Sequence, residues 1–380
     1  MSNEPGKYLE WEQPYLHWLS NVKGIGAKTA LRLMEAAGDG KEVYHLSDAA
    51  LSGMLTKRQK EAFSYARKSK DVHNDYEKLK RRQIRFLSCL HPEYPGRLKE
   101  IPDPPFGIYV KGRLPEEHQC SVAMIGARVC TEYGRRMAVF FARQLAQAGI
   151  QVISGMARGI DGISQKGALQ AGGSSFAVLG SGVDVCYPES NKELYEQLIR
   201  QGGIISEYPP GTKPAPGQFP PRNRIISGLS DGVLVIEAKE KSGTLITVDM
   251  ALEQGREVYV LPGRLTDGLS TGCNRLIKQG AAIVLSPEEL IEEIKGITAM
   301  EHAAESGKYT GSEEEAANRP DGLSDFEWAV YEQLDYYPRG VQQLYEKIPG
   351  SDVAEVVHAL CRLCLRGVVR QVSGGQYVKV

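Results

Sequence analysis

The chain has 380 residues, of which 42% are hydrophobic and 24% charged, and its formal net charge at pH 7 is -1. These values are typical of a globular protein of two or three domains, and they exclude a protein that binds nucleic acid through overall positive charge. The sequence has no run of eighteen apolar residues and no apolar segment near Met1. We therefore expect no membrane span, no cleavable signal and no membrane partner.

Seven cysteines are scattered along the chain, and this odd number favours a reducing cytoplasm over a disulfide scaffold. Cys361 and Cys364 form a lone CxxC pair within a helical pattern. Because no second ligand pair accompanies them, we interpret them as helix-packing residues rather than zinc ligands. The sequence thus predicts a cytoplasmic protein without a metal site.

Residues 1–90 are predicted to form a helical domain, because their apolar positions recur at helical spacing. Within it, the segment 19–30 resembles the helix-hairpin-helix motif. Gly24 and Gly26 make the hairpin tight and leave backbone N–H groups free, and these groups with Lys28 would hold a DNA phosphate without reading sequence. A purely structural helical hairpin explains the same residues equally well.

Residues 91–115 are rich in proline, which excludes a regular helix or a central strand, and we interpret them as a packed, extended connector. From Ser121 onward, strands alternate with helices in the pattern of an α/β sheet. Strands are expected at residues 121–125, 150–154, 174–179, 203–206, 232–237, 257–261 and 282–285. Helices are expected at about residues 133–148, 162–171, 191–201, 222–230, 244–254 and 273–279.

Polar, glycine-containing loops follow several of the expected strands. Gly126-Ala127-Arg128 follows the first strand, and the segment 154–161, which contains Ser154, Gly155 and Arg158, follows the second. Ligands of open α/β sheets bind at the carboxyl ends of the strands. We therefore expect these loops to share one edge of the sheet.

The segment 218–249 adds two helix starts that follow polar loops. Helix starts present free N–H groups and a partial positive charge, which attract phosphate, and an exposed aromatic ring would stack on a base. In the alternative interpretation the arginines pair with core carboxylates and the aromatic residue packs in the core. The residues concerned are Phe219, Arg222, Asn223 and Arg224 at the first start and Ser242, Gly243 and Thr244 at the second.

The strand-rich region lacks the groups of common enzymes. It has no P-loop motif and no complete dinucleotide fingerprint, and no histidine lies between His118 and His302 to act in general acid–base catalysis. We therefore predict no catalytic residue and no cofactor. Carboxylates expected to cap helices or pair with arginines are Asp161, Asp184, Glu207 and Glu237.

The last eighty residues divide into a linker and a small domain. Residues 297–322 are polar and acidic and are predicted to be a flexible linker. Residues 323–380 are predicted to form three helices and a hairpin, the arrangement of a winged-helix domain. Its third helix carries Arg362 and Arg366 but also acidic residues, and this thin basic face indicates a protein-contact or weak nucleic-acid module.

A series of short motifs runs through residues 91–295. In chain order these are Tyr94-Pro95, Pro104-Pro105, Val122 to Arg128, Tyr133-Gly134, Ser154 to Asp161, Gly167-Ala168-Leu169, Tyr187-Pro188, Ser206 to Pro209, Phe219-Pro220, Arg222 to Ile226, Ser242 to Thr247, Gly255 to Val258, Pro262-Gly263 and Gly272 to Ile277. So many motifs in order are highly specific. The region resembles the DNA-processing protein A family, also called Smf, of bacterial transformation.

This resemblance implies an extended Rossmann-like domain over residues 91–296, flanked by a helix-hairpin-helix or SAM-like domain and a winged helix. It implies a homodimer that binds single-stranded DNA, protects incoming DNA and loads the RecA recombinase onto it in natural transformation, with no bond made or broken. Single-strand-binding protein and other competence proteins are further partners that the resemblance suggests.

Three groups of contact residues are predicted. Accessory DNA contacts are expected at the hairpin glycines and Lys28, and a pairing surface at Leu276, Ile277 and Ile283. The predicted DNA and phosphate site comprises Gly126, Arg128, Ser154, Gly155, Arg158, Lys213, Phe219, Arg222, Asn223, Arg224, Ser242, Gly243 and Thr244.

The sequence departs from the family pattern at two positions. Ala127 stands where the family usually has Ser or Thr, and Gln165 where it usually has His. Neither change removes the predicted pocket, although each would tune its affinity.

Two other functions compete with DNA binding. The fold also resembles nucleotide phosphoribohydrolases, but Thr247 stands at the position of their catalytic Glu, although Thr244 is retained. A transcription regulator that acts through residues 352–366 is a third hypothesis, which the thin basic face of that helix disfavours.

Overall fold

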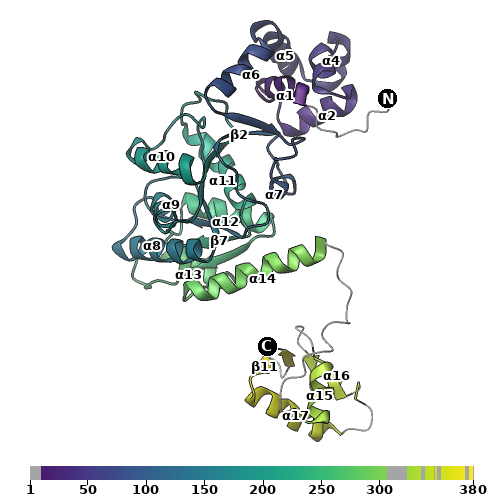
Figure 1. Ribbon diagram of the computed structural model, residues 1–380, viewed down its shortest axis with the longest axis vertical. Helices are drawn as coiled ribbons and strands as arrows, with labels where there is room; N and C mark the ends of the chain where they lie inside the picture. The colour runs from purple at the N-terminus through teal and green to yellow at the C-terminus, as the bar shows by residue number, and fades with distance from the viewer. Residues whose placement is uncertain are drawn as a thin grey trace. The chain divides into compact units, whose positions relative to one another are not determined.

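The computed structural model describes residues 10–305, 323–334, 339–345, 347–348, 352–372 and 376–379. The chain forms two compact units, Met1–His302 and Ala303–Val380, and each is described by itself (Figure 1).

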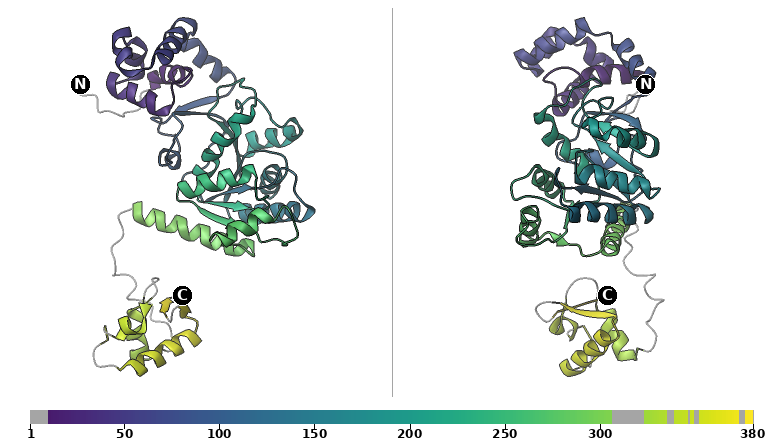
Figure 2. Two further views of the ribbon diagram at one scale, coloured as in Figure 1. Left: turned by 180° about the vertical axis from the view of Figure 1, so that it is seen from behind. Right: turned by 90° about the vertical axis from the view of Figure 1, so that its left-hand side faces the viewer.

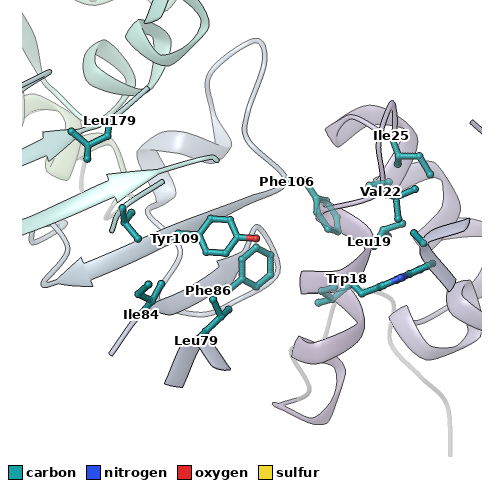
Figure 3. Packing of buried hydrophobic residues seen from close by; sticks show 14 of the residues in the cluster. Trp18, Leu19, Val22, Ile25, Leu79, Ile84, Phe86, Phe106, Tyr109 and Leu179 are labelled. Atoms are coloured by element: carbon teal, nitrogen blue, oxygen red, sulfur yellow. The ribbon is translucent and has the colours of Figure 1, made fainter. Parts of the chain in front are cut away.

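The first unit begins with a group of short helices that gather at one end of it, as two further views show (Figure 2). Their apolar faces enclose a core in which Trp18, Leu19 and Phe63 are almost fully buried (Figure 3). The same cluster includes Phe86 and Tyr109 from the neighbouring sheet, so the helices and the sheet share one core. The helices are α1 (Gln13–Ser20), α2 (Ala27–Ala37), α3 (Gly40–His45), α4 (Asp48–Met54), α5 (Lys57–Ser69) and α6 (Val72–Arg81), preceded by the 3-10 turn η1 (Glu10–Glu12).

A sheet of nine strands forms the centre of the first unit, in the order β1-β2-β6-β5-β4-β3-β7-β8-β9. The strands from β3 to β9 run parallel to their neighbours, whereas β1 and β2 are antiparallel additions at one edge. The α/β class predicted from the sequence is confirmed. The strands are β1 (Arg85–Ser88), β2 (Gly107–Gly112), β3 (Ser121–Ile125), β4 (Gln151–Ser154), β5 (Ser175–Val178), β6 (Gly203–Ser206), β7 (Gly232–Val235), β8 (Glu257–Val260) and β9 (Ala282–Ile283).

Two strands lie where the sequence analysis placed none. The segment 91–115, interpreted as an extended connector, contains the short helix α7 (Gly96–Lys99) and the strand β2, and the predicted helical domain ends in β1. Five of the prolines lie at or before Pro105 and the sixth, Pro115, follows β2, so they leave the backbone N–H groups of β2 free to pair with β6. The proline content thus excluded a strand only on either side of β2.

Helices cover both faces of the sheet, and alternate residues of each strand point to opposite faces. Figure 1 shows α8 and α9 beside one another against the sheet. On one face Val122 and Met124 join Phe141 in a core cluster, whereas Ala123 and Ile125 belong to a second cluster on the other face. The helices are α8 (Glu132–Gln147), α9 (Ile160–Gln170), α10 (Lys192–Gln201), α11 (Phe219–Gly228), α12 (Gly243–Glu253), α13 (Thr271–Lys278) and α14 (Pro287–Glu305), with the turns η2 (Glu189–Asn191) and η3 (Pro216–Gln218).

Residues 297–305, expected to belong to the linker, form the last part of α14, and residues 306–322 lie outside the described residues. None of the helices in the described ranges is both long and apolar enough to span a membrane.

The described residues of the second unit form three helices and a three-stranded sheet around a small apolar core, in which Val330, Leu344 and Leu360 are fully buried. The helix and strand order agrees with the winged-helix prediction, which stays a prediction, and the expected Gly-Gly turn lies outside the described residues. The elements are α15 (Asp325–Glu332), β10 (Arg339–Gly340), α16 (Val341–Tyr345), α17 (Val353–Leu365), β11 (Val369–Val372) and β12 (Gln376–Lys379).

Candidate nucleic-acid interface

A cleft of about 540 Å³ lies at the carboxyl edge of the parallel strands, and we call it the strand-end cleft. Because β4, β3 and β7 are neighbours in the sheet, the loops that follow them meet at this edge. The cleft is lined by the loop after β3, by part of the loop after β4 and by the first turns of α11 and α12. It therefore brings together Gly126, Arg128, Phe219, Arg222, Asn223, Ser242, Gly243 and Thr244 from the predicted site.

The loops after β3 and β4 approach each other so closely that one position tolerates only glycine. Gly159 has φ +76°, and a Cβ atom there would lie 2.2 Å from the carbonyl oxygen of Ala127. The backbone N–H of Ile160 donates to that same oxygen at 3.2 Å. The two loops thus form one rigid support that presents Arg128 to solvent.

Arg128 is the exposed cation of the strand-end cleft, and it lies over an aromatic ring. Its guanidinium carbon is 5.6 Å from the centroid of the Phe219 ring. The Phe219 ring in turn stacks on Tyr187, with centroids 5.7 Å apart and an interplanar angle of 24°. A cation held on a stack of two rings offers one group for phosphate and flat apolar surfaces for a base.

Arg222 lies in the wall of the cleft and is only 6% exposed. Its guanidinium donates to the carbonyl oxygens of Gly155, at 3.0 Å, and Val178. Burial lowers the pKa of Arg222 to about 10, while the nearby Asp161 carboxylate acts in the opposite direction. Arg222 is therefore charged at neutral pH, and it holds loops together beneath the surface while adding positive potential to the cleft.

Asp161 is the carboxylate nearest to this buried cation. Burial raises the pKa of Asp161, opposed first by the charge of Arg222 and then by hydrogen bonds such as that from the Gly155 N–H, at 3.2 Å. Gly155 fits between the two charged groups because a Cβ atom there would lie 2.7 Å from the Arg222 guanidinium. The two residues form a buried electrostatic pair that fixes the wall of the cleft.

Five predicted site residues lie away from the lining, and one of them is Gly155, which supports the cleft wall beneath Arg222. Arg224 forms ion pairs with Glu207, at 2.9 Å, and with Asp103, at 3.1 Å, so for Arg224 the alternative of pairing with carboxylates describes the structure. The Ser154 hydroxyl is buried and donates to a backbone carbonyl oxygen. Lys213 is exposed in a loop outside the lining, and Arg158 lines a neighbouring groove.

The first turn of α12 provides hydrogen-bond donors in the lining of the cleft. Gly243 and Thr244 line the cleft, and the N-terminal residue Ser242 makes no side-chain capping bond. The Ser242 hydroxyl oxygen is shielded from solvent and has no hydrogen-bond partner among the described residues. Helix α12 thus begins with unsatisfied donors, an arrangement that binds anions.

The cleft is poor in groups that transfer protons. Asp161 is the one carboxylate among the described lining residues, and it already accepts a backbone hydrogen bond. Thr247, at the position of the hydrolase glutamate, is 3% exposed. No cluster of metal-binding side chains occurs within the described ranges.

Comparisons with known proteins agree with this geometry. Residues 85–295 match the family model described as DNA recombination-mediator protein A. Protein Smf of Escherichia coli (strain K12) is 38% identical over 330 residues, which cover 86% of this chain and 85% of that protein. The chain belongs to the DNA recombination-mediator protein A family. The family expected from the motifs is thereby confirmed.

Two solved structures show how far the fold extends within the family. DNA processing protein A from Streptococcus pneumoniae superposes with a TM-score of 0.66 at 33% identity and covers 76% of this chain and 98% of that chain. The protein from Helicobacter pylori, whose structure concerns its single-stranded DNA binding mode, gives a TM-score of 0.51 at 30% identity, with 56% and 96% covered. The Rossmann-like core expected from the sequence is therefore shown.

Of the two departures from the family pattern, Ala127 lines the cleft and Gln165 lies behind its wall. Gln165 is fully buried, its side-chain oxygen accepts from the Met156 N–H at 3.1 Å, and its amide nitrogen donates to the Phe176 carbonyl at 2.9 Å. It supports the loop after β4 without facing the cleft. Ala127 contributes only backbone groups to the same support.

Tyr187 is the lining residue that the sequence analysis missed. It follows β5 and is 47% exposed, and its ring lies against Phe219. It was noted only as part of the family motif Tyr187-Pro188. An exposed aromatic residue in a loop at the strand-end edge was the available signal for its role.

The other predicted contact residues lie on separate surfaces. In the hairpin, Gly24 has φ +81° and its carbonyl accepts from Gln59, while Lys28 is exposed. Of the predicted pairing residues, Leu276 is buried in the core, whereas Ile283 is 44% exposed beside another exposed apolar residue.

Proposed function

We propose that this chain binds single-stranded DNA in the strand-end cleft without sequence preference. The observation that carries the proposal is the stack of Arg128 on Phe219 and Tyr187, in the same cleft as the unsatisfied donors at the start of α12. A stacked ring accepts any unpaired base, whereas the bases of a duplex are covered by their neighbours. The cleft therefore suits a single strand better than a duplex.

The direct test measures binding of labelled single-stranded and duplex oligonucleotides across a salt series. We expect a preference for the single strand. Arg128→Ala should weaken single-strand binding about 10-fold and reduce the slope of log K against log salt by about 0.7, the value for one phosphate contact. Arg200→Ala is the matched control, because Arg200 is also exposed but lies at the end of α10, outside the cleft.

Binding that ignores both strand type and the Arg128 variant would contradict the proposal. Release of free base from nucleoside monophosphates would instead revive the hydrolase hypothesis, and we expect none because Thr247 occupies the glutamate position.

We further propose that the bound strand is delivered to the RecA recombinase in the cytoplasm during natural transformation. The family description as a recombination mediator supports this role. The protein should accelerate RecA filament formation on DNA covered by single-strand-binding protein, and the Arg128 variant should lose that effect. If the acceleration does not depend on Arg128, delivery of the strand to RecA does not require DNA binding in the strand-end cleft.

A homodimer is the proposed assembly. Ile283 is 44% and Leu285 75% exposed, and an apolar edge of this kind suits closed two-fold pairing. Ile283→Asp should convert a dimeric mass in solution to a monomeric one, and a monomeric wild-type protein at micromolar concentration would contradict the proposal.

A further inference from the structure

Two further grooves continue the strand-end cleft across the surface of the first unit. A groove of about 410 Å³ shares Arg128 and Ala157 with the cleft. A third, of about 490 Å³, lies on the outer face of α8 and shares Arg135 with the second. Because neighbouring grooves share lining residues, they adjoin one another, and we call this series from the strand-end edge onto α8 the path.

Positive charge dominates the path beyond the cleft. Its two grooves are lined by Arg128, Arg135, Arg136, Arg143, Arg158 and Lys166. The one acidic lining residue in the described chain is Glu193, whose carboxylate is 3.9 Å from Lys166. Arg143 and Arg158 form no ion pair with any described residue, and Arg135 and Arg136 share the single carboxylate of Glu132. The path keeps a net positive charge although the whole chain does not.

An exposed aromatic side chain lies among these cations. Phe140 is 44% exposed, and it follows Arg136 by four residues and precedes Arg143 by three, so the three side chains share one face of α8. The ring of Phe140 packs edge-on against buried Phe141, with centroids 5.9 Å apart and an interplanar angle of 85°. One side of the ring is thus held by the core while the other is open to a ligand.

We propose that the face of α8 binds the continuation of the single strand that occupies the strand-end cleft. Arg136 and Arg143 contact phosphates on either side of a base that stacks on Phe140. This inference rests on the proposed function and extends it along the path. A single strand is the occupant because its unpaired bases can reach a lone ring between two cations, whereas a duplex offers only its backbone.

The test compares a short oligonucleotide of about 6 nucleotides, which fills the cleft alone, with one of about 20, which is longer than the roughly 4–16 nucleotides that one single-strand-binding fold covers. Wild type should bind the long strand at least about 10-fold more tightly. Arg136→Glu/Arg143→Glu should remove that gain and lower the salt slope on the long strand by about 1.4, the value for two phosphates. Binding of the short strand should change less than about two-fold.

A second variant separates stacking from charge. Phe140→Ala should weaken binding of the long strand at least about five-fold and leave its salt slope unchanged, because no phosphate contact is lost. Arg200→Glu/Lys295→Glu is the matched charge control, since both residues are exposed and lie outside the three grooves. Thermal unfolding of each variant verifies that it folds.

The outcomes distinguish this inference from the proposed function. Wild type that binds neither strand length overturns the proposed function, whereas binding that does not improve with length overturns only the inference about α8. A length effect that survives both α8 variants indicates bridging of two protomers and also overturns it. Variants that bind the long strand normally but no longer stimulate RecA would assign this face to a protein partner instead.

Discussion

The strand-end cleft and the turn at Gly24 and Gly26, predicted to be a helix-hairpin-helix, both combine glycines with a basic side chain, but their surroundings differ. In the cleft, Arg128 lies on a stacked pair of rings, and loops from several strands converge on it. In the hairpin, Lys28 is exposed and forms no ion pair or hydrogen bond with a described residue. Glycines next to a cation therefore do not build a site unless the topology brings other elements to them.

The largest expected effect tests the buried support of the cleft. Asp161→Asn removes the carboxylate nearest to buried Arg222, and an uncompensated buried charge costs about 3–5 kcal/mol. We expect urea unfolding to show a loss at the lower end of this range, because Arg222 still donates to two carbonyl oxygens.

The matched control is Glu207→Gln. Its partner Arg224 also pairs with Asp103 and retains that ion pair, so the loss of stability should be smaller. Equal losses in the two variants would show that burial of the Asp161–Arg222 pair has no special weight.

The next effect concerns the support of the hairpin. His17 of α1 is 8% exposed, between Tyr76, Phe86 and Tyr109, and burial lowers its pKa to about 4, with the charge of Lys70 acting in the same direction. In the unfolded chain the His17 imidazole has its ordinary pKa of 6.5, so the unfolded chain binds a proton more tightly than the folded chain does. Stability is fully present above that pH and is lost as the pH falls towards 4, by up to about 3 kcal/mol.

His17→Phe provides the comparison for this pH dependence. A phenyl ring keeps the aromatic packing and removes the titrating group. The free energy of unfolding of the variant should fall less than that of wild type between pH 7 and pH 4. Parallel curves would exclude His17 as the cause.

The strands of the large sheet show what can be predicted from the sequence alone. The strands from Ser121 to Ile283 were predicted to within about two residues, because apolar runs, glycine loops and helical periodicity agree locally along this region. β2 was missed because it joins the sheet by pairing with β6, about one hundred residues away in the chain, and β1 because it pairs with β2 alone at the sheet edge. Short strands that owe their pairing to a distant partner leave only a weak local pattern.

The arginines of the candidate site show the same limit. Arg128, Arg222 and Arg224 all look like phosphate ligands in the sequence, but the structure exposes the first, buries the second and pairs the third with two carboxylates. Whether each arginine is exposed, buried or paired depends on Asp103, on the carbonyl oxygens at two strand ends and on the loops that meet at the edge of the sheet. None of these contacts is local in the chain.

A smaller effect distinguishes the rings of the cleft from its charges. Phe219→Leu keeps an apolar side chain but removes the flat ring, and stacking of a base on an aromatic ring contributes about 1–3 kcal/mol to binding. We expect single-strand affinity to fall by about this amount with the salt slope unchanged. Tyr187→Phe keeps its ring and should bind as wild type does, whereas a similar loss in both variants would implicate the Tyr187 hydroxyl.

The smallest expected effect belongs to the hairpin. Lys28→Ala should weaken binding of DNA by less than about 1 kcal/mol, because an exposed lysine offers one screened phosphate contact without a ring or converging loops. If the hairpin touches DNA, the salt slope should fall by about 0.7 on single strands, as for Arg128→Ala, although the affinity changes far less. The comparison thus depends on the two measurements together. If the two variants lower the salt slope equally but the affinity unequally, both regions contact a phosphate and only the cleft adds stacking. If Lys28→Ala leaves the salt slope unchanged, the hairpin is a structural element that packs on the sheet.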